Sequence, residues 1–271
     1  MPVLEVPGAG LSYRRTGSGP TLLLIPGAGG SGLAFVRVAK RLAAHYSVVR
    51  YARRGFSRSH LDQPPDRGSR LAADADDAAG LIEHLGGRPA AVLGESSGAL
   101  VALELLTRHP DSVRTVVPFE PPAMRLLPDA QQWIDIFDRV HDTYHHHGMR
   151  SALKLFRERT FAESDRKAMR RGVWLQLVTP SIRASFAHWL DYELRQYPAT
   201  PLDLTALRAH RAKIIPAVGR ESRGYPCYRA TAELARQLDL PIAEFPGGHL
   251  AHITEPAAFA RSLVRTLAST L

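Results

Sequence analysis

Short apolar runs alternate along this chain with longer stretches in which apolar and polar residues recur at helical spacing. The runs at 21–25 and 90–94 are apolar at nearly every position, which is typical of parallel strands that helices cover on both faces. The same pattern predicts further strands at 11–16, 46–51 and 113–119. Amphipathic helices are predicted between the strands, at 35–43, 71–85 and 97–109. This alternation predicts an α/β fold with a doubly wound, mostly parallel sheet.

The alternation stops after residue 119, and the segment that follows shows only helical periodicity, broken by prolines. Its helices are predicted near 131–147, 151–161 and 181–197. Strands then return at 213–218 and 241–245, and helices at 231–238 and from 256 onward. We therefore expect a core of residues 1–120 and 213–271, with residues 121–212 inserted as a helical cap.

The composition is that of an ordinary globular protein. Of the 271 residues, 45% are hydrophobic and 23% are charged, and no apolar run approaches the roughly 18 residues that a membrane span requires. The first residues have neither the basic start nor the apolar run of a signal peptide. The single cysteine, Cys227, excludes an intramolecular disulfide, which suits a reducing compartment. We expect a soluble, cytoplasmic protein with no membrane partner.

The formal net charge of +9 raises the question of nucleic-acid binding, because a basic surface is the first sign of phosphate recognition. The arginines are scattered through the whole chain, and no block of lysine and arginine interleaved with aromatic residues occurs. Charge spread in this way is typical of a solvated surface. Nucleic acid is therefore not an expected partner, whereas a homodimer stays open.

A G-E-S-S-G sequence at 94–98 is the strongest chemical signal in the chain. It follows a predicted strand and opens a predicted helix, so this G-x-S-x-G pattern has the strand-turn-helix context of a nucleophile elbow. Such a turn exposes the serine hydroxyl at the carboxyl edge of the sheet. Outside that context the pattern would indicate only a glycine-rich turn. The sequence thus predicts Ser96 as a nucleophile.

Four motifs together resemble the α/β-hydrolase family, and the resemblance covers nearly the whole chain. They are L-I-P-G-A-G-G at 24–30, Y-A-R-R-G-F-S at 51–57, the elbow, and F-P-G-G-H-L at 245–250. The resemblance implies an oxyanion hole of two backbone N–H groups, which fall here on Ala28 and Ser97. The chain has Pro26 where the family usually has histidine, and Ala52 where it usually has aspartate. We expect the contacts that support the oxyanion loop to differ accordingly.

A serine hydroxyl needs a positioned base to act near neutral pH. His249 follows the last predicted strand in a glycine-flanked loop, where the resemblance implies the catalytic histidine. His252 is the alternative. The histidines at 145–147 are interpreted as a polar helix end, because consecutive side chains on a helix do not face one point and so suit no metal. We expect no metal and no organic cofactor.

The acid that orients the histidine has two candidates. Many members of the family carry it after the seventh strand, where this chain reads G-R-E-S at 219–222 and Glu221 lies one residue out of register. A second arrangement in the family, found in zearalenone-type lactonases, places the acid after the sixth strand. Glu120 occupies that place, and the two prolines that follow it stiffen its loop. The sequence favours Glu120 over Glu221.

The cap is expected to cover Ser96, because the family places the segment after the sixth strand over the active site. Its helices would offer aromatic side chains to a substrate pocket. The candidates are Trp133, Phe137, Trp174, Phe186, Trp189 and Tyr192. Each of them also suits the core of the cap.

These residues predict an acyl-enzyme route that cleaves a carboxylic ester or lactone of small to medium, apolar character. Haloalkane dehalogenases and epoxide hydrolases of this fold carry aspartate in the elbow, so Ser96 argues against both reactions. Two alternatives keep the fold: a non-hydrolytic enzyme such as a lyase, cyclase or cofactor-free oxygenase, and a small-molecule receptor. Weak or absent hydrolysis of activated esters would favour either alternative.

Overall fold

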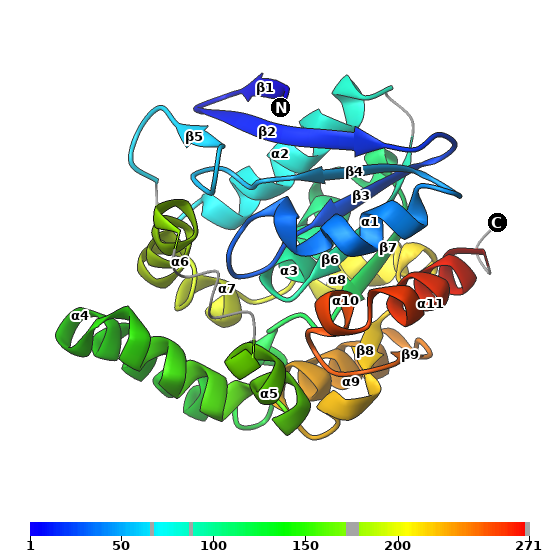
Figure 1. The fold of residues 1–271 in the computed structure, drawn as a ribbon. Coiled ribbons are helices and arrows are strands. Elements are labelled where there is room, and N and C mark those ends of the chain that lie inside the picture. The colour runs from blue at the N-terminus through cyan, green and yellow to red at the C-terminus, as the bar shows by residue number, and fades with distance from the viewer. Residues whose placement is uncertain (66–67, 87–88, 172–178, 269–271) are drawn as a thin grey trace.

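The strands of the protein form one twisted sheet (Figure 1). The computed structural model describes residues 1–65, 68–86, 89–171 and 179–268. The strand order is β1-β2-β4-β3-β6-β7-β8-β9, with β5 beside β2. From β4 to β9 the strands of this order are parallel, whereas β1, β2 and β5 pair antiparallel. The bounds are β1 Val3–Val6, β2 Ala9–Thr16, β3 Thr21–Ile25, β4 Ser47–Tyr51, β5 His60–Leu61, β6 Ala90–Glu95, β7 Val113–Phe119, β8 Ala217–Gly219 and β9 Ala243–Phe245.

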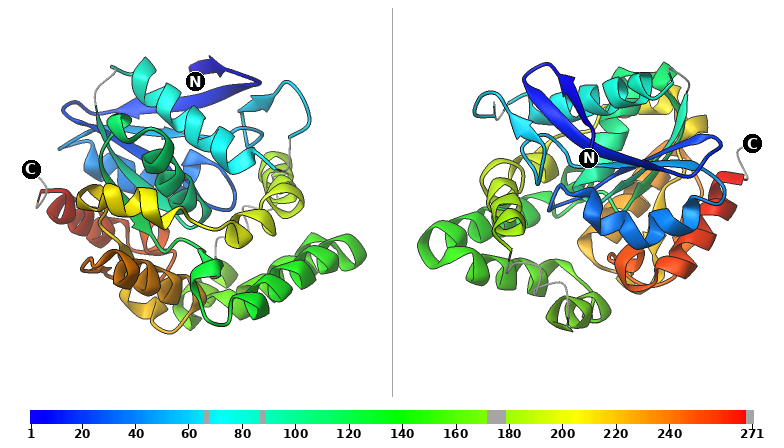
Figure 2. Two further views of the ribbon diagram at one scale, coloured as in Figure 1. Left: turned by 180° about the vertical axis from the view of Figure 1, so that it is seen from behind. Right: turned by 45° about the horizontal axis from the view of Figure 1, so that its top comes forward.

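Helices cover both faces of this sheet. Figures 1 and 2 show α1 and α11 on one side and α2, α3 and α9 on the other. The helix bounds are α1 Val36–Leu42, α2 Arg70–His84, α3 Ser97–Arg108, α4 Ala130–Thr160, α5 Glu163–Arg171, α6 Pro180–Tyr192, α7 Gln196–Ala199, α8 Leu204–Ala209, α9 Pro226–Leu238, α10 Ala251–Thr254 and α11 Pro256–Ala268. In the described part of the chain, none of them combines the length and the apolar character needed to cross a bilayer.

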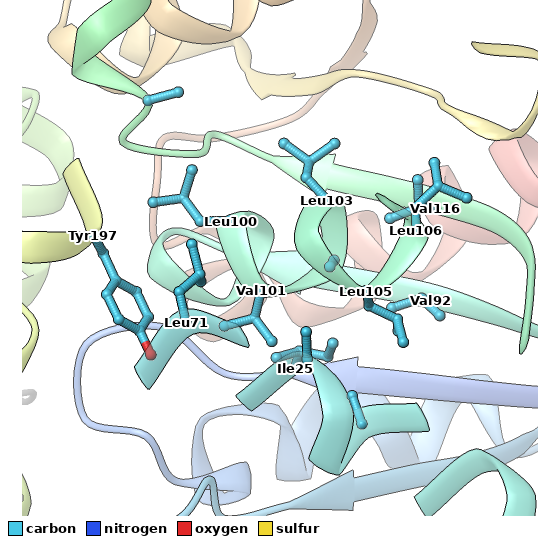
Figure 3. Close-up of a cluster of buried hydrophobic side chains, with 14 of the residues drawn as sticks. Ile25, Leu71, Val92, Leu100, Val101, Leu103, Leu105, Leu106, Val116 and Tyr197 are labelled. Atoms are coloured by element: carbon cyan, nitrogen blue, oxygen red, sulfur yellow. The ribbon is translucent and has the colours of Figure 1, made fainter. Parts of the chain in front are cut away.

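The central strand β3 explains the two layers, because successive side chains of a strand point to opposite faces. Leu22 and Leu24 belong to an apolar cluster with residues of α1 and α11. Leu23 and Ile25 belong to a second cluster with residues of α2, α3 and α9, part of which Figure 3 shows. All four side chains are buried. The predicted α/β fold with a mostly parallel sheet is confirmed, and the predicted strands at 21–25 and 113–119 coincide with β3 and β7.

Residues 121–212, between β7 and β8, contain α4 to α8 and are called the helical insertion below. Figures 1 and 2 show α4 extending away from the sheet. Gly148 interrupts this helix with φ 80° and ψ 168°, a conformation that favours glycine. The interruption lies between the two helices predicted at 131–147 and 151–161.

Candidate active site

The turn between β6 and α3 carries Ser96. Its backbone has φ 54° and ψ −125°, and such a positive φ costs a non-glycine residue on the order of 1–3 kcal/mol. The flanking glycines make the turn feasible. A Cβ on Gly94 would lie 2.3 Å from the carbonyl oxygen of Gly98, and a Cβ on Gly98 would lie 2.3 Å from that of Ile25. The strained turn directs Ser96 to the lining of a large cavity.

His249, in the loop after β9, is paired with a carboxylate from the loop after β7. Its Nδ1 lies 2.6 Å from Glu120 Oε2, and both side chains are buried. The other carboxylate oxygen accepts a hydrogen bond of 2.8 Å from the N–H of Gly219. Glu120 has φ 49°, and its own N–H donates to the carbonyl of Ala217. The fixed carboxylate favours a proton on Nδ1 of His249, which leaves Nε2 to face other groups.

The structure separates the two alternative residues from this pair. Glu221 is exposed, and its backbone N–H donates to the carbonyl of Gly247. His252 is buried and lines the cavity, where its ring lies 5.2 Å from the ring of Phe35, centroid to centroid. Burial lowers the pKa of His252. Among the described residues, its Nδ1 has no hydrogen-bond partner, and no hydrogen bond or ion pair joins its ring to a carboxylate, whereas His249 is paired with Glu120.

A second carboxylate, Glu95, lies on the opposite side of the His249 ring. Its Oε1 is 3.4 Å from Nε2 of His249, and its Oε2 accepts a hydrogen bond of 3.1 Å from the N–H of Gly27. The imidazole therefore lies between two buried acids. Glu95 was not among the predicted site residues, although an acidic residue directly before the elbow serine was a signal that could have indicated it.

These acids set the charge of His249. Burial alone lowers the pKa of an imidazole, but the hydrogen bond and charge of Glu120 outweigh it here, with help from the charges of Glu95 and Asp165. Together they raise the pKa of His249 to about 9. In the free protein at neutral pH, the ring is thus mostly an imidazolium.

Asp165 of α5 connects the helical insertion to the loop that carries His249. Its two oxygens accept hydrogen bonds of 3.0 Å from the N–H groups of His249 and Leu250. The carboxylate is buried, and desolvation raises its pKa. A Cβ on Gly248 would lie 2.4 Å from this carboxylate, so the close approach requires glycine. Sequence reasoning missed Asp165, because it lies in a strongly polar helix that looks like a solvated surface.

Ala28 and Ser97, the predicted oxyanion-hole residues, line the same cavity as Ser96. Among the described residues, neither backbone N–H donates a hydrogen bond to a backbone acceptor. The carbonyls of Pro26 and Gly27, next to Ala28, accept hydrogen bonds of 2.9 and 3.1 Å from the guanidinium of Arg53. This arginine therefore fixes the loop that contains Ala28.

Arg53 is also the centre of a buried ion-pair network. Its guanidinium lies 2.6 Å from Asp74 and 2.7 Å from Glu193, and Glu193 also pairs with Arg70 at 2.9 Å. All four side chains are at most 1% exposed. Burial by itself lowers the pKa of Arg53, but Glu193 and Asp74 raise it well above its usual value. Glu193 follows α6, so the network joins the helical insertion to the core.

The cavity has a volume of about 470 Å³, within the range of ligand pockets. Of the predicted aromatic residues, Phe137, Phe186 and Trp189 line it. Trp133 and Tyr192 are described but lie outside this lining, and Trp174 lies outside the described residues. Further lining residues that were not predicted as such are Phe156, Phe161, Tyr197 and Cys227. The cavity that Ser96 and His249 line therefore has several aromatic side chains in its wall, and the ring of Phe161 lies 5.1 Å from that of His249, centroid to centroid.

The sheet order, the elbow after β6 and the histidine loop after β9 together define the α/β-hydrolase fold. The profile of the Alpha/beta hydrolase family matches residues 22–262. The chain belongs to this family.

The comparisons with known proteins agree with that membership. The chain is 34% identical over 269 residues to the uncharacterized hydrolase YraK of Bacillus subtilis, covering 96% of this chain and 93% of YraK. Its structure is similar to that of a thermophilic esterase from Thermogutta terrifontis, with a TM-score of 0.78, 19% identity and coverage of 100% and 99%. It is also similar to the enol-lactonase from Burkholderia xenovorans, with a TM-score of 0.74, 22% identity and coverage of 98% and 100%.

Proposed function

We propose that this protein is a serine hydrolase that cleaves a carboxylic ester or lactone of small to medium, apolar character through an acyl-enzyme. One observation carries the proposal. The strained Ser96 and the ring of His249, whose Nδ1 is held by the buried Glu120, line a single cavity. Esterase and enol-lactonase neighbours in the same fold support this class of reaction.

In the proposed reaction, Ser96 Oγ attacks the substrate carbonyl while Nε2 of His249 accepts its proton. The N–H groups of Ala28 and Ser97 donate to the oxyanion, and each such donor lowers the barrier by roughly 3 kcal/mol. The tetrahedral intermediate then collapses, and His249 returns the proton to the leaving alkoxide. Water, activated by the same imidazole, releases the acid. Glu120 stabilises the imidazolium in both steps.

The substrate class follows from the cavity wall. Phe137, Phe186 and Trp189 come from the helical insertion, which acts as a cap over Ser96 in this proposal. Aromatic walls bind apolar groups by removing their surface from water. A substrate with an apolar acyl or alkyl part beside its ester carbonyl fits such a wall.

The first test is labelling with a fluorophosphonate, which reacts covalently with an activated serine. We expect wild-type protein to gain one label, mapped to Ser96 by peptide mass. Ser96→Ala should gain none, whereas Ser181→Ala, which removes an exposed serine from the cavity rim, should label like wild type. Folded wild-type protein that takes no label would refute the proposal and favour a receptor or a non-hydrolytic enzyme.

A panel of aryl esters and lactones then tests the substrate class. We expect turnover that Ser96→Ala reduces at least about 10³-fold, since the loss of the nucleophile removes the acyl-enzyme route. Esters and lactones with a charged group beside the carbonyl should be poorer substrates than their apolar analogues.

A further inference from the structure

Two histidines of α4 and one aspartate of α6 meet in the helical insertion, outside the cavity lining. His141 and His145 are four residues apart, so their side chains lie on the same face of the helix. Their Nε2 atoms are 3.1 Å apart, and Nε2 of His145 is 3.3 Å from Asp191 Oδ1. One potential ligand atom of each residue lies within 4.8 Å of the other two.

These spacings are close to those of a metal site. Nitrogen and oxygen ligands lie about 2.0–2.2 Å from zinc, so neighbouring ligand atoms of a tetrahedral site are roughly 3.3 Å apart. The two short spacings at His145 match that length. Hydrogen bonds alone explain these two short distances poorly, because Nε2 of His145 faces both His141 and Asp191 and carries at most one proton. A cation between the three residues would accept a lone pair from each.

The surroundings favour the same role for His141. Its Nδ1 is buried and lies 3.5 Å from Asp142 Oδ1. A carboxylate near Nδ1 favours the proton there and leaves the Nε2 lone pair free, as in many histidine metal sites. The cation of Arg195 lies nearby, but Asp138 is 4.0 Å from its guanidinium and offsets its charge.

We infer that His141, His145 and Asp191 bind a divalent transition-metal cation of the zinc type, with water as the remaining ligand. Two imidazoles and one carboxylate are a donor set that zinc accepts readily. The run at 145–147 does not act as a unit; the site pairs position 145 with position 141, one helical turn away. It links α4 to α6, the helices that carry Phe137 and Trp189 of the cavity wall. The inference does not depend on the chemistry of Ser96.

The experiment uses the full chain without a histidine tag, first treated with a chelator and then titrated with Zn²⁺ against a chromophoric competitor. We expect one equivalent to bind, and Co²⁺ in its place should show the visible absorption bands of a tetrahedral site. His145→Gln and Asp191→Asn should each weaken binding at least about 10-fold, since even outer partners of metal ligands contribute that much. His147→Gln, an exposed histidine of the same helix, is the matched control and should bind like wild type.

Thermal unfolding gives a second readout, because a ligand that binds only the folded state raises Tm as its concentration increases. At the same concentration, Zn²⁺ should raise the Tm of wild type and of His147→Gln by more than that of Asp191→Asn. The inference is overturned if wild type binds no Zn²⁺ at micromolar concentration, or if His147→Gln weakens binding as much as His145→Gln. Full affinity in Asp191→Asn would also overturn it, because the bridge to α6 would then be absent. Circular dichroism checks that each variant is folded.

Discussion

Glu95→Gln tests whether the second carboxylate sets the pH dependence of the reaction. The substitution removes a negative charge 3.4 Å from Nε2 of His249 but keeps a side-chain oxygen that can accept the N–H of Gly27. Two unit charges at this distance interact by about 1.2 kcal/mol even at the dielectric constant of bulk water, which corresponds to roughly 0.9 pKa unit. The low dielectric of a buried site increases the interaction. The pKa of His249, about 9 in the wild type, should therefore fall by at least about 0.9 unit in the variant.

The sign follows from the role of the imidazole as a base. In the proposed mechanism only neutral His249 accepts the proton of Ser96, so kcat/KM should increase with pH and level off above a pKa of about 9. In Glu95→Gln the same rise should come at lower pH, and kcat/KM at pH 7 should increase by at least about sevenfold, the change in the neutral fraction of His249 that a fall of about 0.9 unit produces.

The assay is the hydrolysis of an activated aryl ester between roughly pH 6 and 10, because kcat/KM reports the pKa of groups in the free enzyme. Glu233→Gln is a suitable control, since Glu233 lies on α9, pairs with Arg236 and is absent from the cavity lining. Its profile should coincide with that of wild type. A Glu95→Gln profile that is unshifted, or shifted to higher pH, would refute the reasoning.

Three further substitutions test the supporting contacts. Glu120→Gln should lower kcat about 10²–10⁴-fold with little change in KM, because the His249 tautomer is no longer fixed; an unchanged kcat would exclude Glu120 as the orienting acid. Asp165→Asn removes one of two buried acceptors and should lower the free energy of unfolding in urea by roughly 1–3 kcal/mol. Glu193→Gln leaves the buried Arg53 short of a counter-charge and should cost about 3–5 kcal/mol, seen as a lower Tm; a Tm equal to that of wild type would contradict this account.

The strands that the sequence predicted best lie in the middle of the sheet. β3 and β7 are covered on both faces, so nearly every position is apolar and the run is visible in the sequence. The unpredicted β1 and β5 have four and two residues and lie at the antiparallel edge. Strands so short and half exposed leave no pattern that differs from a loop.

Local motifs were enough to place Ser96 and His249, because each is in a glycine-containing turn beside a strand. The contacts around them could not be read in the same way. Glu95, Asp165 and Glu193 bond to partners 68, 84 and 140 residues away along the chain. The periodicity of apolar residues indicates which side chains share a face of one helix or strand. It does not indicate which residues from distant parts of the chain form hydrogen bonds with each other.

The helical insertion is attached to the core by charge as well as by apolar contact. Glu193 pairs with Arg53, which donates to the loop that contains Ala28, and Asp165 accepts hydrogen bonds from the backbone of the His249 loop. A chimera that receives the insertion of another family member would leave two buried N–H groups without acceptors and the buried Arg53 without its pair to Glu193, unless the donor segment brings carboxylates to both places. Substrate range and catalytic geometry are therefore not separable modules in this protein, and they can diversify in evolution only through paired changes in insertion and core.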